Sequence, residues 1–140
     1  MYNCIMYSFE TKIRVRYAET DQMGFVYYGN YAQYFEVGRV ELLRSLGISY
    51  KKIEEMGFAL PVVNFNINYK APALYDDEVI IKTIVKEIPT AKITFNYETF
   101  NNVGDLLNIG EVVLVFVNRD TKKPCTAPDI IKNKFIKVLK

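Results

Sequence analysis

The chain of 140 residues contains no histidine. Without histidine it cannot build a Ser-His-Asp or Cys-His catalytic arrangement, an HExxH motif or a histidine-rich metal site. It also has no GxGxxG motif and no Walker-type glycine loop. If the protein is an enzyme, its proton chemistry must come from Asp, Glu, Lys, Tyr or water. We therefore expect neither a metal nor a cofactor.

Cysteines and long apolar runs are also scarce. Cys4 and Cys125 lie near opposite ends of the chain and form no close pair, so we expect neither a disulfide framework nor a zinc site, and two inert thiols. The longest apolar run, from Val112 to Val117, is too short to span a bilayer, and the N-terminus lacks the pattern of a signal peptide. These observations predict a soluble, cytoplasmic protein that does not bind membranes.

Neither positive nor negative charge dominates the composition. The 18 basic and 16 acidic residues are well mixed and give a net charge of +2, without the basic stripe of a nucleic-acid-binding protein. The length predicts a single domain over residues 1–140 with a core of useful size. Aromatic residues make up 14% of the chain, and this surplus is typical of a surface buried between subunits.

Hydrophobic periodicity predicts one strand and then a long helix in the first third of the chain. Alternation over residues 11–17 predicts a half-buried strand with Tyr17 on its inner side. From Tyr31, apolar residues recur every three or four positions, which predicts a helix of about 16 residues with Gly47 at its C-terminal cap. Gly38 inside this helix costs about 1 kcal/mol relative to Ala, and close approach to a neighbouring backbone, such as a sheet, is the usual reason to tolerate it.

The rest of the chain is rich in Val, Ile, Phe and Thr and predicts mainly strands. A short helix is expected over residues 49–56, and residues 129–138 form either a C-terminal helix or a tail. The four expected strands cover residues 59–69, 77–87, 91–100 and 106–119. Their short connections favour antiparallel neighbours. The order of elements predicts an α+β fold in which a helix packs on one antiparallel sheet.

The stretch ETDQMGFVYYGNY, residues 19–31, joins the first strand to the long helix. Asp21 could form an Asx turn there, with Asn30 capping the helix and the tyrosines in the core. Asp21 could instead be a catalytic carboxylate, because the free N–H groups at a helix N-terminus can polarise a carbonyl and hold an oxyanion. Gly24 and Gly29 would then let a substrate approach the backbone closely. The residues alone leave both interpretations open.

This stretch resembles the signature of the 4-hydroxybenzoyl-CoA thioesterase-like family of hot-dog proteins. In that family a D-x-x-G-x-V-x-(H or Y)-x-N-Y segment leads into the central helix, and the later stretch NYKAPALYDDEVIIKT is similar to the family's strand, proline turn and acidic pair. The matching positions of the first motif are Asp21, Gly24, Val26, Tyr28, Asn30 and Tyr31. The resemblance covers roughly residues 10–120. It implies a hot-dog fold, in which a five- or six-stranded antiparallel sheet wraps around one long helix, and active sites at the interface of a homodimer or a homotetramer (a dimer of dimers).

The resemblance also implies an activity, the hydrolysis of an acyl-CoA thioester to a free acid and coenzyme A. Asp21 would be the nucleophile or general base, and the backbone N–H of Tyr28 would polarise the thioester carbonyl. Coenzyme A would be part of the substrate, an acyl carrier protein could replace it, and Lys70 and Lys92 are candidates to bind its phosphates. The other residues expected in the substrate pocket are Gly24, Val26, Tyr27, Gly29, Asn30, Tyr31 and Glu36.

Two other functions stay open. A hydratase or dehydratase of the same fold would typically use a histidine, which this chain lacks; a non-catalytic acyl-CoA-binding or sensing module would not need one. Among the remaining carboxylates, Glu36 and Glu41 are expected on an interface or solvated face of the long helix, and Glu36 could border the acyl pocket. Asp76 and Asp77 are expected in a polar turn. The acyl group, the choice between dimer and tetramer, and the choice between nucleophilic and general-base catalysis are left open.

Overall fold

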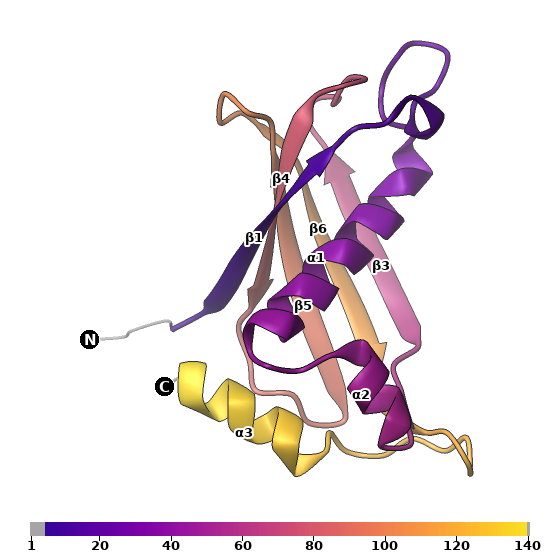
Figure 1. Cartoon of the computed structure of the whole chain (residues 1–140), viewed down its shortest axis with the longest axis vertical. Coiled ribbons are helices and arrows are strands. Elements are labelled where there is room, and N and C mark those ends of the chain that lie inside the picture. The colour runs from indigo at the N-terminus through magenta and orange to yellow at the C-terminus, as the bar shows by residue number, and fades with distance from the viewer. Residues whose placement is uncertain (1–4, 140) are drawn as a thin grey trace.

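A computed structural model of the chain describes residues 5–139. Five antiparallel strands form one sheet in the order β1-β4-β5-β6-β3, and a long helix, α1, lies across one face of it (Figure 1). The strands are β1 (Tyr7–Arg14), β3 (Val62–Tyr69), β4 (Glu78–Val85), β5 (Lys92–Phe100) and β6 (Leu106–Val115), and a small second sheet pairs β2 (Phe58–Ala59) with β7 (Val117–Asn118). The helices are α1 (Tyr31–Ser45), α2 (Tyr50–Glu55) and α3 (Asp129–Val138), and two 3-10 turns are η1 (Tyr17–Glu19) and η2 (Tyr28–Asn30).

This architecture confirms the predicted α+β fold and most of its elements. Two of the predicted strands are each divided in two, because residues 59–69 contain the break between β2 and β3, and residues 106–119 contain the break between β6 and β7. Pro61 lies at the first break, where it has no N–H to offer a ladder, although its carbonyl still accepts from the N–H of Val115 at 3.1 Å. The C-terminal segment is a helix rather than a tail, since its Ile131 and Phe135 are buried in the core.

The predicted strand over residues 11–17 is wrong at both ends. The strand begins at Tyr7 and ends at Arg14. The inward alternation continues as far as Val15, which is buried, but the carboxylate of Glu19 then accepts the backbone N–H of Arg16 at 2.8 Å and turns the chain into η1. Tyr17, predicted to face inward, is consequently 79% exposed.

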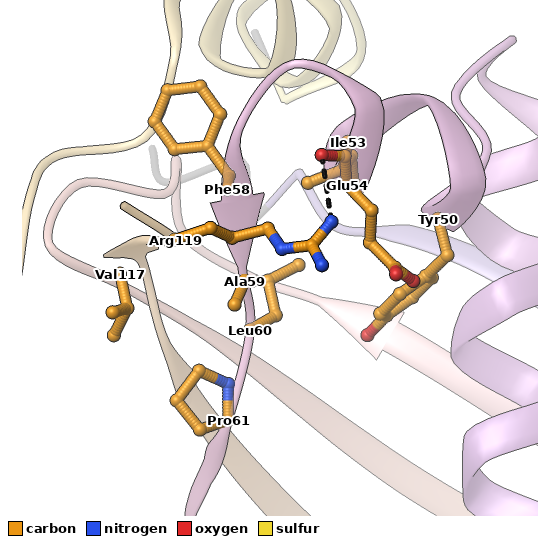
Figure 2. Close-up of a pocket in the computed structure, with 9 residues that line it drawn as sticks. All are labelled: Tyr50, Ile53, Glu54, Phe58, Ala59, Leu60, Pro61, Val117 and Arg119. Carbon is orange, nitrogen blue, oxygen red and sulfur yellow. Dashed lines mark hydrogen bonds between the residues drawn. The ribbon is translucent and has the colours of Figure 1, made fainter. Parts of the chain in front are cut away.

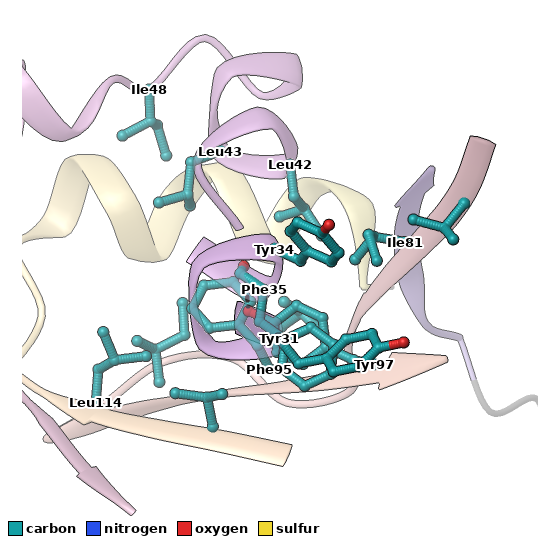
Figure 3. Packing of buried hydrophobic residues seen from close by; sticks show 14 of the residues in the cluster. Tyr31, Tyr34, Phe35, Leu42, Leu43, Ile48, Ile81, Phe95, Tyr97 and Leu114 are labelled. Atoms are coloured by element: carbon teal, nitrogen blue, oxygen red, sulfur yellow. Dashed lines mark hydrogen bonds between the residues drawn. The ribbon is translucent and has the colours of Figure 1, made fainter. Parts of the chain in front are cut away.

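The inner side of α1 packs against the sheet and forms a large part of the core with it (Figure 3). The ring of Phe35 stacks on the ring of Tyr97 with centroids 4.0 Å apart and planes 5° apart, and the Tyr97 hydroxyl donates to the Phe35 carbonyl at 2.9 Å. The Phe35 ring also covers Gly110 of β6, where an added Cβ would lie 2.5 Å from it. These contacts fix the rotation of α1 about its axis, and with it the direction in which the helix presents its outer residues.

At Gly38 helix α1 approaches the sheet closely. A Cβ added there would overlap the hydroxyl of Thr83 and lie 3.0 Å from the side chain of Ile81. The expected close approach of this glycine to a sheet is therefore confirmed. None of the helices described in residues 5–139 combines the length and the apolar character that a membrane crossing needs.

Candidate active site

A tight loop between β1 and α1 carries Asp21. The Asp21 N–H donates to the Phe25 carbonyl at 2.8 Å, and its Oδ1 accepts from the N–H groups of Met23 at 2.9 Å and Phe25 at 3.1 Å. Gly24 adopts a φ of +80°, a left-handed conformation that glycine reaches without steric cost. Asp21 thus forms an Asx turn, but within residues 5–139 no hydrogen bond reaches its Oδ2. The turn orients the carboxylate and leaves one oxygen for chemistry.

Buried Glu19 anchors this loop to the helix. Its Oε1 accepts from the Arg16 N–H and the Tyr34 hydroxyl, both at 2.8 Å, and its Oε2 accepts from the Arg16 guanidinium at 3.1 Å. Burial alone would raise the pKa of Glu19, but the hydrogen bonds from Arg16 and Tyr34 outweigh it and lower the pKa. The Glu19 carbonyl in turn accepts from the Tyr27 N–H and the Asn30 amide, each at 2.8 Å. Sequence reasoning missed this residue, because its bond to Tyr34 joins the loop to α1 and depends on the tertiary fold.

The chain enters α1 through η2, and this corrects the role predicted for Asn30. Asn30 has helical backbone angles, φ −71° and ψ −17°, and its side chain makes no capping hydrogen bond, because its amide is used by Glu19. The first turn of the helical segment therefore begins earlier, at Tyr28. In the described part of the chain the Tyr28 N–H has no hydrogen-bond acceptor, whereas the Tyr28 carbonyl accepts from the Tyr69 hydroxyl at 3.0 Å. An unused N–H at a helix start is a ready donor to a ligand oxygen.

Asp21 and Tyr28 line one pocket of about 340 Å³ at the N-terminal end of α1. Its lining comes from the loop, the helix start and the end of β3. The lining residues are Asp21, Phe25, Val26, Tyr28, Tyr31, Tyr69, Lys70, Ala71 and Pro72. The pocket thus brings together a carboxylate, an unused N–H and one cation.

Some of the predicted pocket residues lie elsewhere. Val26, Tyr28, Tyr31 and Lys70 join Asp21 in this pocket. The predicted residues that do not line it are Gly24, Tyr27, Gly29, Asn30 and Glu36. Among the residues that sequence reasoning missed, Tyr69 precedes Lys70 in the second stretch of the family resemblance, and that stretch was the one signal that could have pointed to it.

Tyr31 forms the inner wall of the pocket. It is almost fully buried, and its ring lies 5.8 Å from that of Tyr69, centroid to centroid. Burial, reinforced by the nearby Tyr69 phenol, raises the pKa of Tyr31 to about 12. Tyr31 therefore stays a neutral phenol at physiological pH and cannot act as the base.

Glu36 and Lys92 lie away from this pocket within one chain. Glu36 borders a groove of about 340 Å³ between α1, β3 and β6. That groove is lined by Ala32, Gln33, Glu36, Arg39, Val62, Phe65 and Val112. Lys92 borders a polar depression of about 300 Å³ that also contains Lys86. Because Lys92 begins β5 and Lys70 follows the end of β3, the two lysines occupy opposite ends of the sheet.

A further pocket, of about 440 Å³, lies between α2 and the small sheet (Figure 2). Its walls are mainly apolar, and the Arg119 guanidinium on its rim donates to the Glu54 carbonyl at 3.3 Å. Tyr50 forms its side toward α1 (Figure 2). No residue predicted for the site lies here. Within residues 5–139 no three Asp, Glu or Cys side chains cluster closely enough to hold a metal ion.

The remaining carboxylates lie as predicted. Glu41 pairs with Arg44 at 3.3 Å on the solvated side of α1. Asp77 accepts from the Leu74 N–H at 2.9 Å within the turn before β4, and Asp76 occupies a left-handed position of that turn with φ +68°. Cys125 is a partly buried free thiol, and Cys4 lies outside the described residues.

Comparison with known proteins identifies the family. Residues 15–135 match the thioesterase-like superfamily. The Bacillus subtilis protein YneP is 37% identical over 85% of this chain and 86% of its own length, and the acyl-CoA thioester hydrolase YbgC of Escherichia coli is 32% identical over 91% and 95%. A DHNA-CoA thioesterase from Staphylococcus aureus, 37% identical, superimposes with a TM-score of 0.89 over 94% of this chain and 90% of its own.

Fold and site together define a hot-dog protein with a carboxylate beside a helix N-terminus. The chain belongs to the thioesterase-like superfamily, as the motif around Asp21 predicts. Its relatives place it among the thioester hydrolases.

Proposed function

We propose that this protein is an acyl-CoA thioesterase that hydrolyses a thioester to a carboxylic acid and coenzyme A, with Asp21 as the catalytic carboxylate. The observation that carries the proposal is the shared pocket of the free Asp21 oxygen and the unused Tyr28 N–H. The names of relatives support the reaction, because YbgC of Escherichia coli is a thioester hydrolase and the Staphylococcus aureus protein acts on DHNA-CoA.

In the proposed reaction the thioester carbonyl oxygen accepts the Tyr28 N–H, which polarises the carbonyl and then holds the oxyanion of the tetrahedral intermediate. Oδ2 of Asp21 either attacks the carbonyl carbon or removes a proton from the attacking water. The carbon–sulfur bond breaks, and the thiolate leaves and takes up a proton that comes from water. In the general-base route the attacking water supplies the second oxygen of the acid; in the nucleophilic route water then hydrolyses the acyl–Asp21 anhydride, which releases the acid and restores the carboxylate. The two N–H groups that hold Oδ1 keep the carboxylate oriented throughout.

Tyr69 has a positioning role in this scheme. Its hydroxyl donates to the Tyr28 carbonyl and so holds the peptide that contributes the polarising N–H. Lys70, the next residue, lines the same pocket and carries the positive charge that a coenzyme A phosphate, or the phosphopantetheine of a carrier protein, would meet. Lys92 is too far from this pocket within one chain, so a role for it requires a second subunit.

The free edge of β3 supports a homodimer. Among the strands of residues 5–139, β3 pairs only with β6, and several of its apolar side chains are exposed. These exposed side chains are Val62, Val63, Phe65 and Tyr69. A long apolar edge strand is prone to pair with another chain, and two-fold pairing of identical edges is antiparallel. In such a dimer the end of β3, which lies beside Asp21, is paired with the start of the partner's β3. The groove between α1, β3 and β6 of the partner then lies toward the pocket of Asp21 and Tyr28.

A charged residue placed on the free edge of β3 tests whether the dimer forms through this strand. Val63→Lys places a charge on the free edge, and we expect it to convert the dimer to monomer in sedimentation velocity. Val103→Lys, at a residue that is 76% exposed in a turn, is the matched control and should leave the dimer intact. A Val63→Lys protein that sediments like wild type would contradict pairing through β3.

Thiol release tests the activity. Purified protein is incubated with short-chain, medium-chain and aromatic acyl-CoA substrates, and free thiol is followed with a chromogenic disulfide. We expect turnover that is lost when Asp21 is changed to Asn. A non-catalytic binding module is the second candidate, because the Asx turn alone gives Asp21 a structural use. Saturable binding of acyl-CoA with no thiol release over hours would favour that candidate.

A further inference from the structure

Arg39 is a buried cation that has no carboxylate partner in the described chain. It lies on α1 and is 7% exposed, yet no acidic side chain of residues 5–139 forms a salt bridge with it. Its Nε donates to the Tyr50 hydroxyl at 3.2 Å. The Tyr97 hydroxyl donates to the Phe35 carbonyl, and its oxygen faces the Arg39 guanidinium as a second neutral acceptor. Taking a charge out of water costs several kcal/mol unless a partner compensates it, and two phenols compensate it only in part.

Arg39 is one of the residues that line the groove between α1, β3 and β6. Apolar side chains from both strands, Val62, Phe65 and Val112, form the wall opposite the helix. Glu36, one helical turn before Arg39, lines the same groove and is exposed. The groove therefore offers apolar contact along its length, with a buried hydrogen-bond donor and a solvated acceptor on its helical side.

We infer that Arg39 selects the acyl group, and that the preferred substrates carry an oxygen acceptor at the end remote from the thioester. This inference rests on the proposed function. Arg39 follows Tyr28 by on the order of 15 Å along the helix axis, and its long side chain leans back toward the N-terminus. A medium-length acyl group whose thioester is held at Tyr28 can reach the Arg39 guanidinium of the same chain, or that of the partner if it extends into the partner's groove. A hydroxyl oxygen could accept from Arg39 and donate to Glu36, whereas a carboxylate would gain the cation and be repelled by Glu36.

Three acyl-CoA substrates of equal chain length test the inference: octanoyl-CoA, 8-hydroxyoctanoyl-CoA and suberoyl-CoA, which ends in a carboxylate. A site built to hydrogen-bond a substrate oxygen discriminates strongly against the analogue that lacks it. We expect kcat/KM for at least one oxygenated substrate to exceed that for octanoyl-CoA by tenfold or more. Comparison of 8-hydroxyoctanoyl-CoA with suberoyl-CoA shows whether the preferred acceptor is neutral or anionic. Equal kcat/KM values for all three substrates would overturn the inference while leaving thioesterase activity intact.

Substitutions assign the preference to Arg39. Arg39→Met keeps the length of the side chain and removes its donors, and we expect it to reduce the tenfold preference to about twofold or less. Arg44→Met removes an exposed arginine of the same helix and should keep the wild-type preference. If Arg39→Met does not fold by circular dichroism, Arg39→Lys retains a cation and should give an intermediate preference. An unchanged preference in a folded Arg39 variant would overturn the inference.

A second subunit could instead supply the missing anion, and the same variants detect this. If Arg39 pairs with a carboxylate of the partner, Arg39→Met would weaken the dimer in sedimentation equilibrium and leave the substrate preference unchanged. That result would assign Arg39 to the interface. If no acyl-CoA is turned over by the wild-type protein, the proposed function fails first, so the two failures are distinguishable.

Discussion

Replacing Glu19 by Gln tests whether the carboxylate that anchors the Asp21 loop stabilises the protein by being ionised. Two of its bonds reach Oε1 at 2.8 Å: the bond from the Tyr34 hydroxyl is buried, and the bond from the Arg16 N–H is partly buried. A hydrogen bond to a charged group contributes about 1.5–3 kcal/mol and a neutral one about 1 kcal/mol. Losing the charge at two bonds therefore costs about 2 kcal/mol. The Arg16 side chain is 76% exposed, so losing its ion pair adds at most about 1 kcal/mol.

We expect Glu19→Gln to lower the free energy of unfolding by about 2–3 kcal/mol at pH 7, which corresponds to a fall in Tm of roughly 6–10 °C. The hydrogen bonds lower the pKa of Glu19 below its ordinary value of 4.5. The stabilisation by the ionised form is thus complete above pH 4.5 and is lost as pH falls through the folded-state pKa. The difference between wild type and variant should accordingly shrink below pH 4.5.

Urea unfolding followed by circular dichroism at fixed protein concentration, from pH 7.5 to pH 3.5, measures this difference. Glu10→Gln removes an exposed carboxylate of β1 and is the matched control, with an expected change below about 0.5 kcal/mol. A Glu19→Gln difference that is equally large at pH 7 and at pH 3.5 would refute the role of the charge. A difference near zero at pH 7 would refute the anchoring role of the side chain.

Two further substitutions test contacts on either side of the site. Gly38→Ala should destabilise the protein by up to about 2 kcal/mol in urea unfolding, because overpacking against Thr83 costs about 1–3 kcal/mol and exceeds the gain of about 1 kcal/mol in helix propensity; a more stable variant would contradict the close approach of α1 to the sheet. Tyr69→Phe removes the bond to the Tyr28 carbonyl and should lower kcat by about three- to tenfold with KM little changed; an unchanged kcat would exclude the positioning role.

The features that sequence could predict are those set by local pattern. The 3–4 spacing from Tyr31 is a property of one continuous segment, so α1 is predicted within a residue or two of its ends. Gly38 was also interpretable, because a glycine inside a helix needs a tertiary reason. Asp21 became a specific candidate only through the spacing of its motif, since an Asx turn and a catalytic carboxylate require the same residue at the same place.

The features that sequence could not predict depend on partners far along the chain. Glu19 is held by Tyr34, and Tyr28 by Tyr69, which is 41 residues away. Asn30 is an example of a wrong local prediction. Its residue type favours a helix cap, but its amide donates to the Glu19 carbonyl, and the helical backbone begins before it. In each case a tertiary hydrogen bond decides the role of the residue, and for Asn30 it overrides a local preference.

In the proposed reaction the free oxygen of Asp21 performs the chemistry, and Asp21→Asn tests this role most directly. Asn can keep the Asx turn, because its carbonyl oxygen accepts the same N–H groups of Met23 and Phe25, so the loop should survive. Asp76→Asn, in a turn outside the pocket, is the control. With acyl-CoA substrates and a thiol-release assay, we predict that kcat of Asp21→Asn falls at least about 100-fold while acyl-CoA binding by calorimetry is retained. A kcat within twofold of wild type would contradict the assignment of Asp21.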